Sequence, residues 1–190
     1  MPRLALFASG NGSNIQRIAD YFSGDHHVTI DLILINNPQA YVIERATNLK
    51  IPSVVFNRKE FYESNYVLDI LTVQNISHII LAGFLWLIPG NILSAYPGKI
   101  LNIHPALLPK YGGKGMYGMH VHQAVIASGD TESGISVHYV NEKYDDGQII
   151  FQSRCPLTPE DTPETLAAKI HELEYRYFPE VIESVVKNSI

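Results

Sequence analysis

The sequence predicts an α/β protein: an open, mostly parallel, twisted sheet with helices on both faces. Short apolar, β-branched runs bounded by turn residues alternate with helix-period stretches along the first half of the chain. These runs are apolar on both faces, as in parallel strands that helices cover from both sides. The pattern changes in the second half, where two strand-like runs and one long helical stretch follow a glycine-rich loop.

The individual elements follow from apolar periodicity and turn signals. The expected parallel strands are residues 4–8, 29–35, 53–56, 78–82 and 100–103. The expected helices between them are residues 13–21, 39–49 and 59–74, and Asn57 with Glu60 forms a capping box for the third. Residues 134–140 and 148–155 predict an antiparallel hairpin appended to the sheet. A long C-terminal helix is expected after Asp161, with Pro179 bending or interrupting it.

Composition limits the class of protein. The 190 residues fit a single domain, 1–190, and the apolar fraction of 46% is that of an ordinary globular chain. A net charge of -5 argues against a nucleic-acid partner. The single Cys155 excludes an internal disulfide framework and suits a reducing compartment. The first apolar run is too short for a signal peptide, and no run is long enough for a membrane span. We therefore expect a cytoplasmic protein without a membrane partner.

The loop after the first expected strand, residues 9–14 (SGNGSN), has the composition of an anion site at a helix N-terminus. It lacks the lysine of a phosphate-binding P-loop. It also lacks the third glycine of a dinucleotide fingerprint, because Ile15 stands there, and Asn36 and Asn37 replace the expected acid. A phosphomonoester held by backbone N–H groups, Ser13 and Asn14 remains. The alternative is a tight turn in which Ser13 is merely the helix N-cap.

Residues 101–110, LNIHPALLPK, place an amide and an imidazole at the end of a buried strand. Asn102 and His104 are two residues apart, so both side chains point to one face of an extended chain. Pro105 ends the strand, which puts His104 at the rim where α/β sheets bind ligands. An aspartate from the DDG sequence at 145–147 would complete a proton-moving triad. The alternative is a core histidine satisfied by a backbone carbonyl.

Other candidates have simpler explanations. His120 and His122 are expected on a helix, where their side chains diverge, so a metal site is disfavoured and none is predicted. His138 is expected to pack in the core. His171 and Glu174 are expected to form a solvated surface pair. Residues 84–88 (FLWLI) form either core or an apolar wall for a flat heteroaromatic ligand.

Taken together, the motifs ASGNGSN, LAGF, LNIHPALLPKY, SVHYV and DDGQII resemble those of the phosphoribosylglycinamide formyltransferases. These are folate-dependent enzymes of purine synthesis within the formyltransferase superfamily, and the resemblance covers nearly the whole chain. The superfamily shares NIHPxLLP, whereas GNGSN is the narrower mark. The resemblance implies a Rossmann-like formyltransferase fold and transfer of a formyl group from 10-formyltetrahydrofolate to the amine of 5'-phosphoribosylglycinamide.

Site residues carry over only where this sequence matches the motifs. The implied catalytic positions are Asn102, His104 and Asp145. The implied substrate positions are Gly12, Ser13 and Asn14 for the phosphate and Glu174 for the glycinamide. The implied folate positions are Arg58, Leu85, Trp86, Leu87, Ile88, Asn102, Asn141, Glu142, Lys143 and Tyr144. Trp86 stands where arginine is common and Asp146 replaces a glycine. The loop of residues 111–118 (YGGKGMYG) is longer than the family's short form, and we expect it to be mobile and a candidate lid.

The chemistry implied is direct attack by an amine on a formyl carbon. We expect an ionised Asp145 to favour protonated His104, which with Asn102 would stabilise the developing negative charge. The partners implied are small molecules, and a monomer or weak homodimer is expected. Two alternative activities use the same triad, namely hydrolysis of 10-formyltetrahydrofolate and formylation of another amine. The third alternative is a non-enzymatic folate or phosphate binding module.

Overall fold

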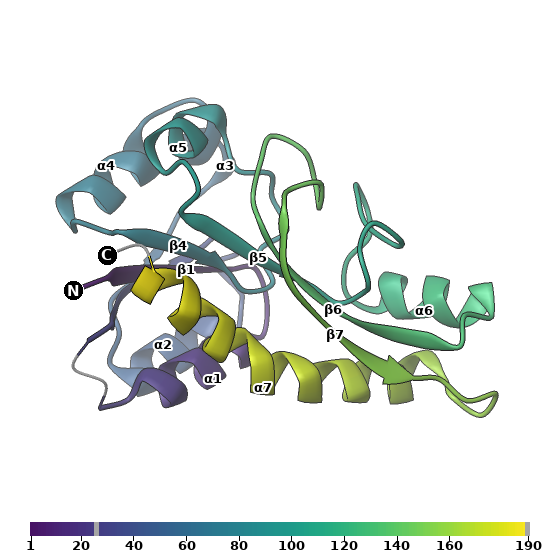
Figure 1. The fold of residues 1–190 in the computed structure, drawn as a ribbon. Coiled ribbons are helices and arrows are strands. Elements are labelled where there is room, and N and C mark those ends of the chain that lie inside the picture. The colour runs from purple at the N-terminus through teal and green to yellow at the C-terminus, as the bar shows by residue number, and fades with distance from the viewer. Residues whose placement is uncertain (25–26, 189–190) are drawn as a thin grey trace.

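The chain is built around one seven-stranded sheet with the strand order β3-β2-β1-β4-β5-β6-β7 (Figure 1). The computed structural model describes residues 1–24 and 27–188. The strands are β1 (Arg3–Ala8), β2 (Thr29–Ile35), β3 (Ser53–Val55), β4 (His78–Leu81), β5 (Ile100–His104), β6 (Glu132–Tyr139) and β7 (Ile149–Pro156). β1 to β5 pair in parallel, whereas β6 is antiparallel to both β5 and β7. The mostly parallel sheet and its appended hairpin are therefore confirmed.

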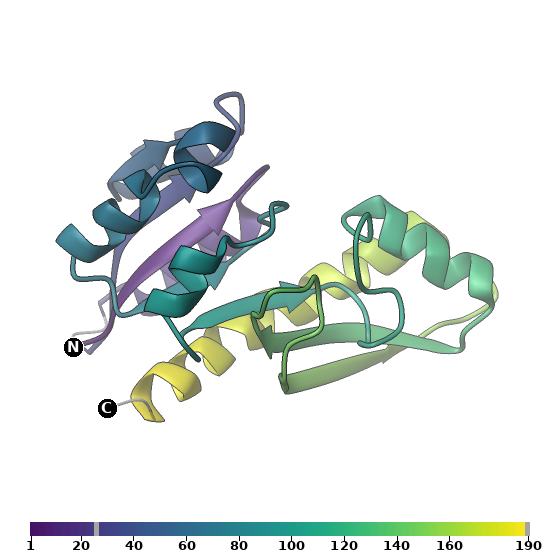
Figure 2. The same ribbon diagram turned by 90° about the horizontal axis from the view of Figure 1, so that it is seen from above.

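Helices cover the sheet on both faces. They are α1 (Ser13–Phe22), α2 (Val42–Leu49), α3 (Arg58–Tyr62), α4 (Tyr66–Val73), α5 (Gly90–Ala95), α6 (Met119–Ser128) and α7 (Pro163–Asn188). Figure 1 shows α3, α4 and α5 on one face and α1, α2 and α7 on the other. Seen from above, β6 and β7 extend away from the parallel strands, with α6 near their far end (Figure 2).

The core has two halves because the side chains of a strand alternate between faces. In β1, Leu4, Leu6 and Ala8 pack with α1, α2 and α7, while Ala5 and Phe7 pack with α3, α4 and α5. All five side chains are fully buried. The near-continuous apolar run in the sequence therefore reflects a strand that is covered on both faces.

The single helix expected over residues 59–74 is wrong. Two helices, α3 and α4, replace it, and the chain leaves the helical path at residues 63–65. Ser64 explains the break, because its hydroxyl donates to the carbonyl of Glu60 and accepts from the N–H of Tyr66. The capping box of Asn57 and Glu60 is present at the start of α3. The short helix α5, which begins after Pro89, was not expected.

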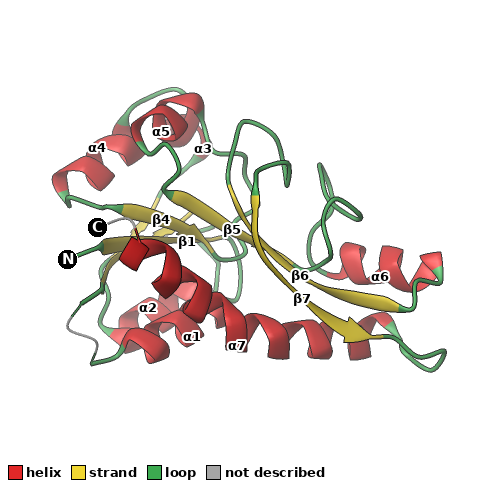
Figure 3. Cartoon of the chain, viewed as in Figure 1, coloured by secondary structure: helices red, strands yellow, loops and turns green. Residues whose placement is uncertain are grey.

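The C-terminal helix α7 runs without interruption through Pro179, as Figure 3 shows. The proline is buried, as are its neighbour Phe178 and the next apolar positions, Val181 and Ile182. Packing of this apolar stripe against the sheet compensates the one backbone hydrogen bond that a proline cannot donate. Among the residues that the structure describes, no helix, α7 included, is long and apolar enough to cross a membrane.

The strand order determines where a ligand can bind. β2 and β3 lie on one side of β1, and β4 and β5 lie on the other. The connections after β1 and after β4 therefore diverge, which opens a crevice at the carboxyl ends of these strands. The SGNGSN loop, the LAGF segment and His104 all lie at that edge.

Candidate active site

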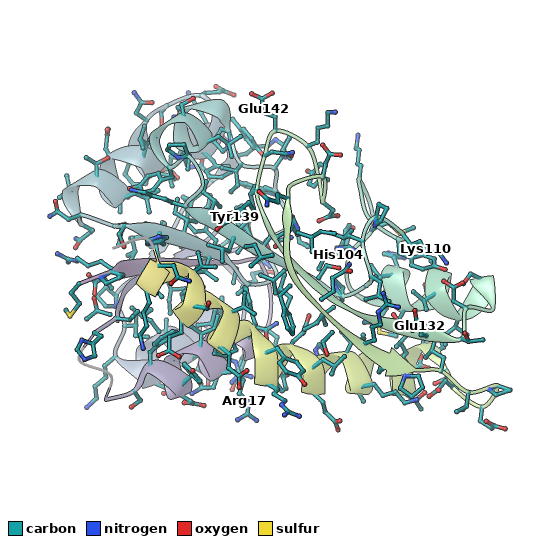
Figure 4. The ribbon with its side chains drawn as sticks, viewed as in Figure 1. Arg17, His104, Lys110, Glu132, Tyr139 and Glu142 are labelled. Carbon is teal, nitrogen blue, oxygen red and sulfur yellow. The ribbon has the colours of Figure 1, made fainter. Side chains whose placement is uncertain are left out.

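A cavity of about 710 Å³ opens at the carboxyl ends of β1, β4 and β5. Its walls come from the loops after these three strands, the glycine-rich loop before α6, the turn before β7, and α7. The predicted site residues that line it are Gly12, Ser13, Asn14, Leu85, Trp86, Leu87, Asn102, His104, Lys143, Tyr144, Asp145 and Glu174. Figure 4 shows His104 at the middle of the molecule, where these segments meet.

Four predicted folate positions do not line this cavity. Ile88 is 3% exposed and packs in the core half that contains α3, α4 and α5. The guanidinium of Arg58 lies over the rings of Tyr62 and Trp86, 5.0 Å and 5.6 Å from their centroids. Asn141 hydrogen-bonds within its own turn, to the N–H of Lys143 and to Asp146, and Glu142 points outward (Figure 4).

The loop after β1 leaves the N-terminus of α1 open to the cavity. The N-cap is Gly12, in the left-handed conformation at φ 74°, and it offers no side-chain cap. A Cβ on Gly12 would lie 2.4 Å from Cγ2 of Val42, so only glycine fits. Ser13 is the first helical residue rather than the N-cap, so the capping role that the tight-turn alternative gave it is wrong. The first-turn N–H groups thus lack a side-chain cap at the wall of the cavity, an arrangement that suits an anion.

Gly12→Ala is expected to lower the free energy of unfolding by about 1 to 3 kcal/mol, because it combines a left-handed backbone with the overlap on Val42. Urea denaturation measures this difference. Gly10→Ala is the matched control in the same loop, since a Cβ there has no atom within 4 Å. Equal stability of the two variants would contradict the conclusion that only glycine fits at position 12.

Asn102 is held by a residue whose role the sequence did not reveal. Nδ1 of His138 lies 2.8 Å from the carbonyl of Tyr139, so this nitrogen carries the proton and Nε2 accepts from the Asn102 amide at 3.0 Å. Nδ2 of Asn102 also lies 3.5 Å from Oδ1 of Asp145, at the long limit of a hydrogen bond, and Asn102 lines the cavity. His138 is buried, as expected, but it also orients the amide. His138 lies directly opposite Asn102 in the antiparallel β5–β6 pair. This strand register cannot be read from the sequence, so the contact was not predictable.

His104 lies between a backbone carbonyl and a carboxylate. Its Nε2 is 2.7 Å from the carbonyl oxygen of Tyr111 and must donate, while its Nδ1 is 3.5 Å from Oδ2 of Asp145. Oδ2 of Asp145 also accepts the N–H of Gly113 at 2.9 Å. Asp146 is more than half exposed and lies 3.9 Å from Lys143. The aspartate beside His104 is therefore Asp145.

Burial dominates the electrostatics of His104. Burial lowers its pKa more than Asp145 and the Tyr111 carbonyl raise it, so the imidazole is neutral at pH 7. The expected protonated His104 is therefore wrong for the free protein, because desolvation outweighs the neighbouring charge. Burial raises the pKa of the Asp145 carboxyl as well, but hydrogen bonding to the carboxylate, including that from the Gly113 N–H, more than offsets it, so the pKa is lowered. The site therefore pairs a neutral base with a carboxylate.

Glu174 of α7 lies inside the cavity rather than on the surface. It is 5% exposed, and Oε2 accepts from Nδ2 of Asn14 at 3.1 Å and from Nδ1 of His171 at 3.0 Å. The hydrogen bond to Glu174 raises the pKa of His171. The expected pair is present and His171 is exposed, but the surface position expected for Glu174 is wrong, because α7 packs against α1 and Glu174 lines the cavity.

The segment after β4 supplies an apolar wall. Phe84 is buried in a cluster of rings with Phe7 and Phe61, whereas Leu85 is 44% exposed. The hydroxyl of Ser9 accepts the N–H of Leu85 at 3.0 Å and ties this wall to the loop after β1. Core and wall are thus both present in residues 84–88, and the wall can receive a flat ring system.

The glycine-rich loop, residues 111–118, contributes to the cavity from Gly113 onward. Its first residues are held by the contacts of Tyr111 and Gly113 described above, and its mobility stays a prediction. Within residues 1–24 and 27–188, no three His, Cys, Asp or Glu side chains gather in a way that could hold a metal ion. The site combines an apolar wall with polar groups whose chemistry suits anion binding and proton transfer.

The chain is similar to known proteins over nearly its whole length. The family model described as formyl transferase matches residues 2–182. The chloroplastic phosphoribosylglycinamide formyltransferase of Arabidopsis thaliana is 40% identical over 99% of the chain, which spans 66% of that protein. The Haemophilus influenzae enzyme of the same name is 38% identical over 96% of the chain and 86% of its own length.

Solved structures give the same result. The crystal structure of phosphoribosylglycinamide formyltransferase from Streptococcus pneumoniae superposes with a TM-score of 0.86, at 37% identity, over 98% of this chain and 99% of that one. The structure from Geobacillus kaustophilus named glycinamide ribonucleotide transformylase 1 also gives 0.86, at 39% identity, over 96% and 97%. The chain belongs to the formyl transferase family.

Proposed function

We propose that this protein transfers the formyl group of 10-formyltetrahydrofolate to the amine of 5'-phosphoribosylglycinamide. The observation that carries the proposal is that one cavity joins three features: the open N-terminus of α1, the Glu174 carboxylate, and the Asn102–His104–Asp145 group. These features suit a phosphate, an amine and a carbonyl oxygen that gains charge. The names of the relatives point to the same reaction.

The acceptor occupies the side of the cavity between α1 and α7. Its phosphate accepts the N–H groups at the start of α1, with Ser13 and Asn14 beside them. Glu174, already hydrogen-bonded to Asn14, accepts from the N–H groups of the glycinamide. The apolar wall of residues 84–87 suits the flat pterin of the donor, and the turn with Lys143 and Tyr144 closes the same side.

When bound, 10-formyltetrahydrofolate supplies an electrophilic formyl carbon and leaves as tetrahydrofolate. A new carbon–nitrogen bond forms to the amine, the bond to the folate nitrogen breaks, and the amine proton ends on that folate nitrogen. The second amide N–H of Asn102, whose contact with Asp145 is long at 3.5 Å, donates to the formyl oxygen as it gains negative charge. Nδ1 of neutral His104 takes the proton through water, and Asp145, 3.5 Å away, stabilises the imidazolium.

One assay separates this activity from the alternatives. Purified protein is incubated with 10-formyltetrahydrofolate, with and without phosphoribosylglycinamide, and folate release is followed. Release that depends strictly on the acceptor supports transfer. Release without it indicates hydrolysis, transfer only to an amine without phosphate indicates another formyltransferase, and binding without release indicates a binding module.

Glu174→Gln is expected to raise the KM for phosphoribosylglycinamide about 10- to 100-fold, because a charged hydrogen bond to the acceptor is weakened. The KM for the folate is expected to stay unchanged, since Glu174 lies on the acceptor side. Steady-state kinetics with each substrate varied in turn measures both. Glu172→Gln, exposed on the same helix, is the control. A rise in the folate KM alone would count against the assignment of sides.

The assembly expected for this chain, a monomer or weak homodimer, stays a prediction. Light scattering over a range of protein concentrations tests it.

A further inference from the structure

The turn of residues 111–113 touches both members of the His104–Asp145 pair. The carbonyl of Tyr111 accepts Nε2–H of His104 at 2.7 Å, and the N–H of Gly113 donates to Oδ2 of Asp145 at 2.9 Å. A Cβ on Gly112 would lie 3.2 Å from Cβ of Asp145 and 2.6 Å from Leu108, so the backbone packs directly against the carboxylate side chain. The turn therefore sets the relative position of imidazole and carboxylate.

The backbone of this turn is in an unfavourable conformation. Tyr111 is a non-glycine residue at φ 56°, in the left-handed region. Such a conformation costs of the order of 1 kcal/mol for a residue with a Cβ, so surrounding contacts must hold it. It is this conformation that directs the Tyr111 carbonyl toward His104.

The side chain of Tyr111 supplies the holding contacts. Its hydroxyl lies 2.7 Å from Oδ2 of Asp130 and 2.6 Å from Oγ of Ser128. Ser128 is the last residue of α6, and Asp130 follows just after the helix. Nζ of Lys110 lies 3.1 Å and 2.9 Å from the two carboxylate oxygens of Asp130. Hydrogen bonds from Tyr111 and Lys110 lower the pKa of Asp130, so it is ionised and accepts from both. Figure 4 shows Lys110 on the α6 side of His104.

We infer that Tyr111 and Asp130 are positioning residues for the reaction: their side-chain contact holds the turn of residues 111–113, whose carbonyl and N–H keep His104 and Asp145 aligned. This inference rests on the proposed function. The Tyr111 carbonyl also selects the tautomer of His104, because a carbonyl oxygen beside Nε2 requires the proton on that nitrogen. Nδ1 is thereby left unprotonated beside Asp145, where the proposed proton transfer needs it.

Tyr111→Phe removes the hydroxyl but keeps the ring, and Asp130→Asn removes the charge that accepts it. Each is expected to lower kcat about 10- to 100-fold, with the KM values changed within about twofold, because misplaced catalytic groups slow the chemical step. The double variant is expected to lose no more than the stronger single variant, since both substitutions weaken the same contact between Tyr111 and residue 130. Tyr21→Phe is the matched control, because it removes a hydroxyl–carboxylate hydrogen bond, to Glu183, on the opposite part of the chain.

Nitrogen NMR of protein labelled at histidine tests the inference without substrate, with the His104 signals assigned by their loss in His104→Ala. In the wild type the proton is expected on Nε2 at neutral pH. In Tyr111→Phe and Asp130→Asn the population is expected to shift toward the tautomer protonated at Nδ1, which then faces Asp145. If the wild type transfers no formyl group, the proposed function fails while this measurement still decides the inference.

Two results would overturn the positioning role. One is wild-type kcat in both variants. The other is an unchanged Nε2-protonated His104 in both variants, with any loss of kcat matched by loss of thermal stability, which would indicate a purely structural contact.

Discussion

Replacing His104 by alanine is expected to lower kcat about 100- to 1,000-fold, because the variant loses the base that accepts the amine proton. The KM values are expected to change little, since neither the α1 N-terminus nor the wall of residues 84–87 depends on the imidazole. Steady-state kinetics with saturating folate and varied acceptor measures both constants.

His27→Ala is the control for this substitution. His27 is an exposed histidine in the connection before β2, outside the cavity, so its removal is expected to leave kcat unchanged. Circular dichroism of both variants checks that they fold. A His104→Ala enzyme that turns over at the wild-type rate would remove His104 from the mechanism.

Asp145→Asn is expected to lower kcat about 100-fold, because the imidazolium formed during the reaction loses its charged partner. The variant is also expected to shift the pH profile. Asp145 raises the pKa of His104, so removing its charge lowers that pKa further. Activity that needs neutral His104 is present above this pKa and lost as pH falls through it. The acid limb of kcat/KM therefore moves to lower pH in the variant.

The adjacent Asp146→Asn provides a matched control, because it removes one carboxylate charge a single residue away. Asp146 faces solvent near Lys143, so both kcat and the acid limb are expected to stay at their wild-type values. A larger effect at Asp146 than at Asp145 would reverse the assignment of the catalytic carboxylate.

The elements of the fold were predictable where local chemistry agrees with the tertiary structure. The buried strands are recognisable in the sequence as apolar runs because helices cover both faces of the sheet. The expected helix over residues 59–74 failed because a serine hydroxyl competes with the backbone at its middle, a choice that apolar periodicity does not register. The expected interruption at Pro179 is absent because packing of α7 outweighs one missing hydrogen bond, and a bend there stays a prediction.

The candidate site was predictable in its residue types rather than in its contacts. Gly12, Asn102 and His104 stand at loop and strand ends, and those positions are visible along the chain. An aspartate of the DDG sequence was expected beside His104 from the residues themselves. The choice of Asp145 and the place of Glu174 came only through the resemblance, because both lie far along the chain from His104. The charge state of His104 was not predictable at all, since it depends on how deeply the side chain is buried.

Local sequence is therefore sufficient for the parallel sheet, the glycine-rich turn after β1 and the amide–imidazole spacing in β5, because each depends on neighbouring residues. Only the structure shows that Gly12 rather than Ser13 is the N-cap of α1. Long-range packing selects Asp145 over Asp146, turns Glu174 into the cavity and sets His138 behind Asn102. It also brings the Tyr111 carbonyl to His104 through a contact with Asp130. These arrangements depend on how α7, the hairpin and the loop before α6 fold back on the sheet, and no periodicity along the chain encodes those distances.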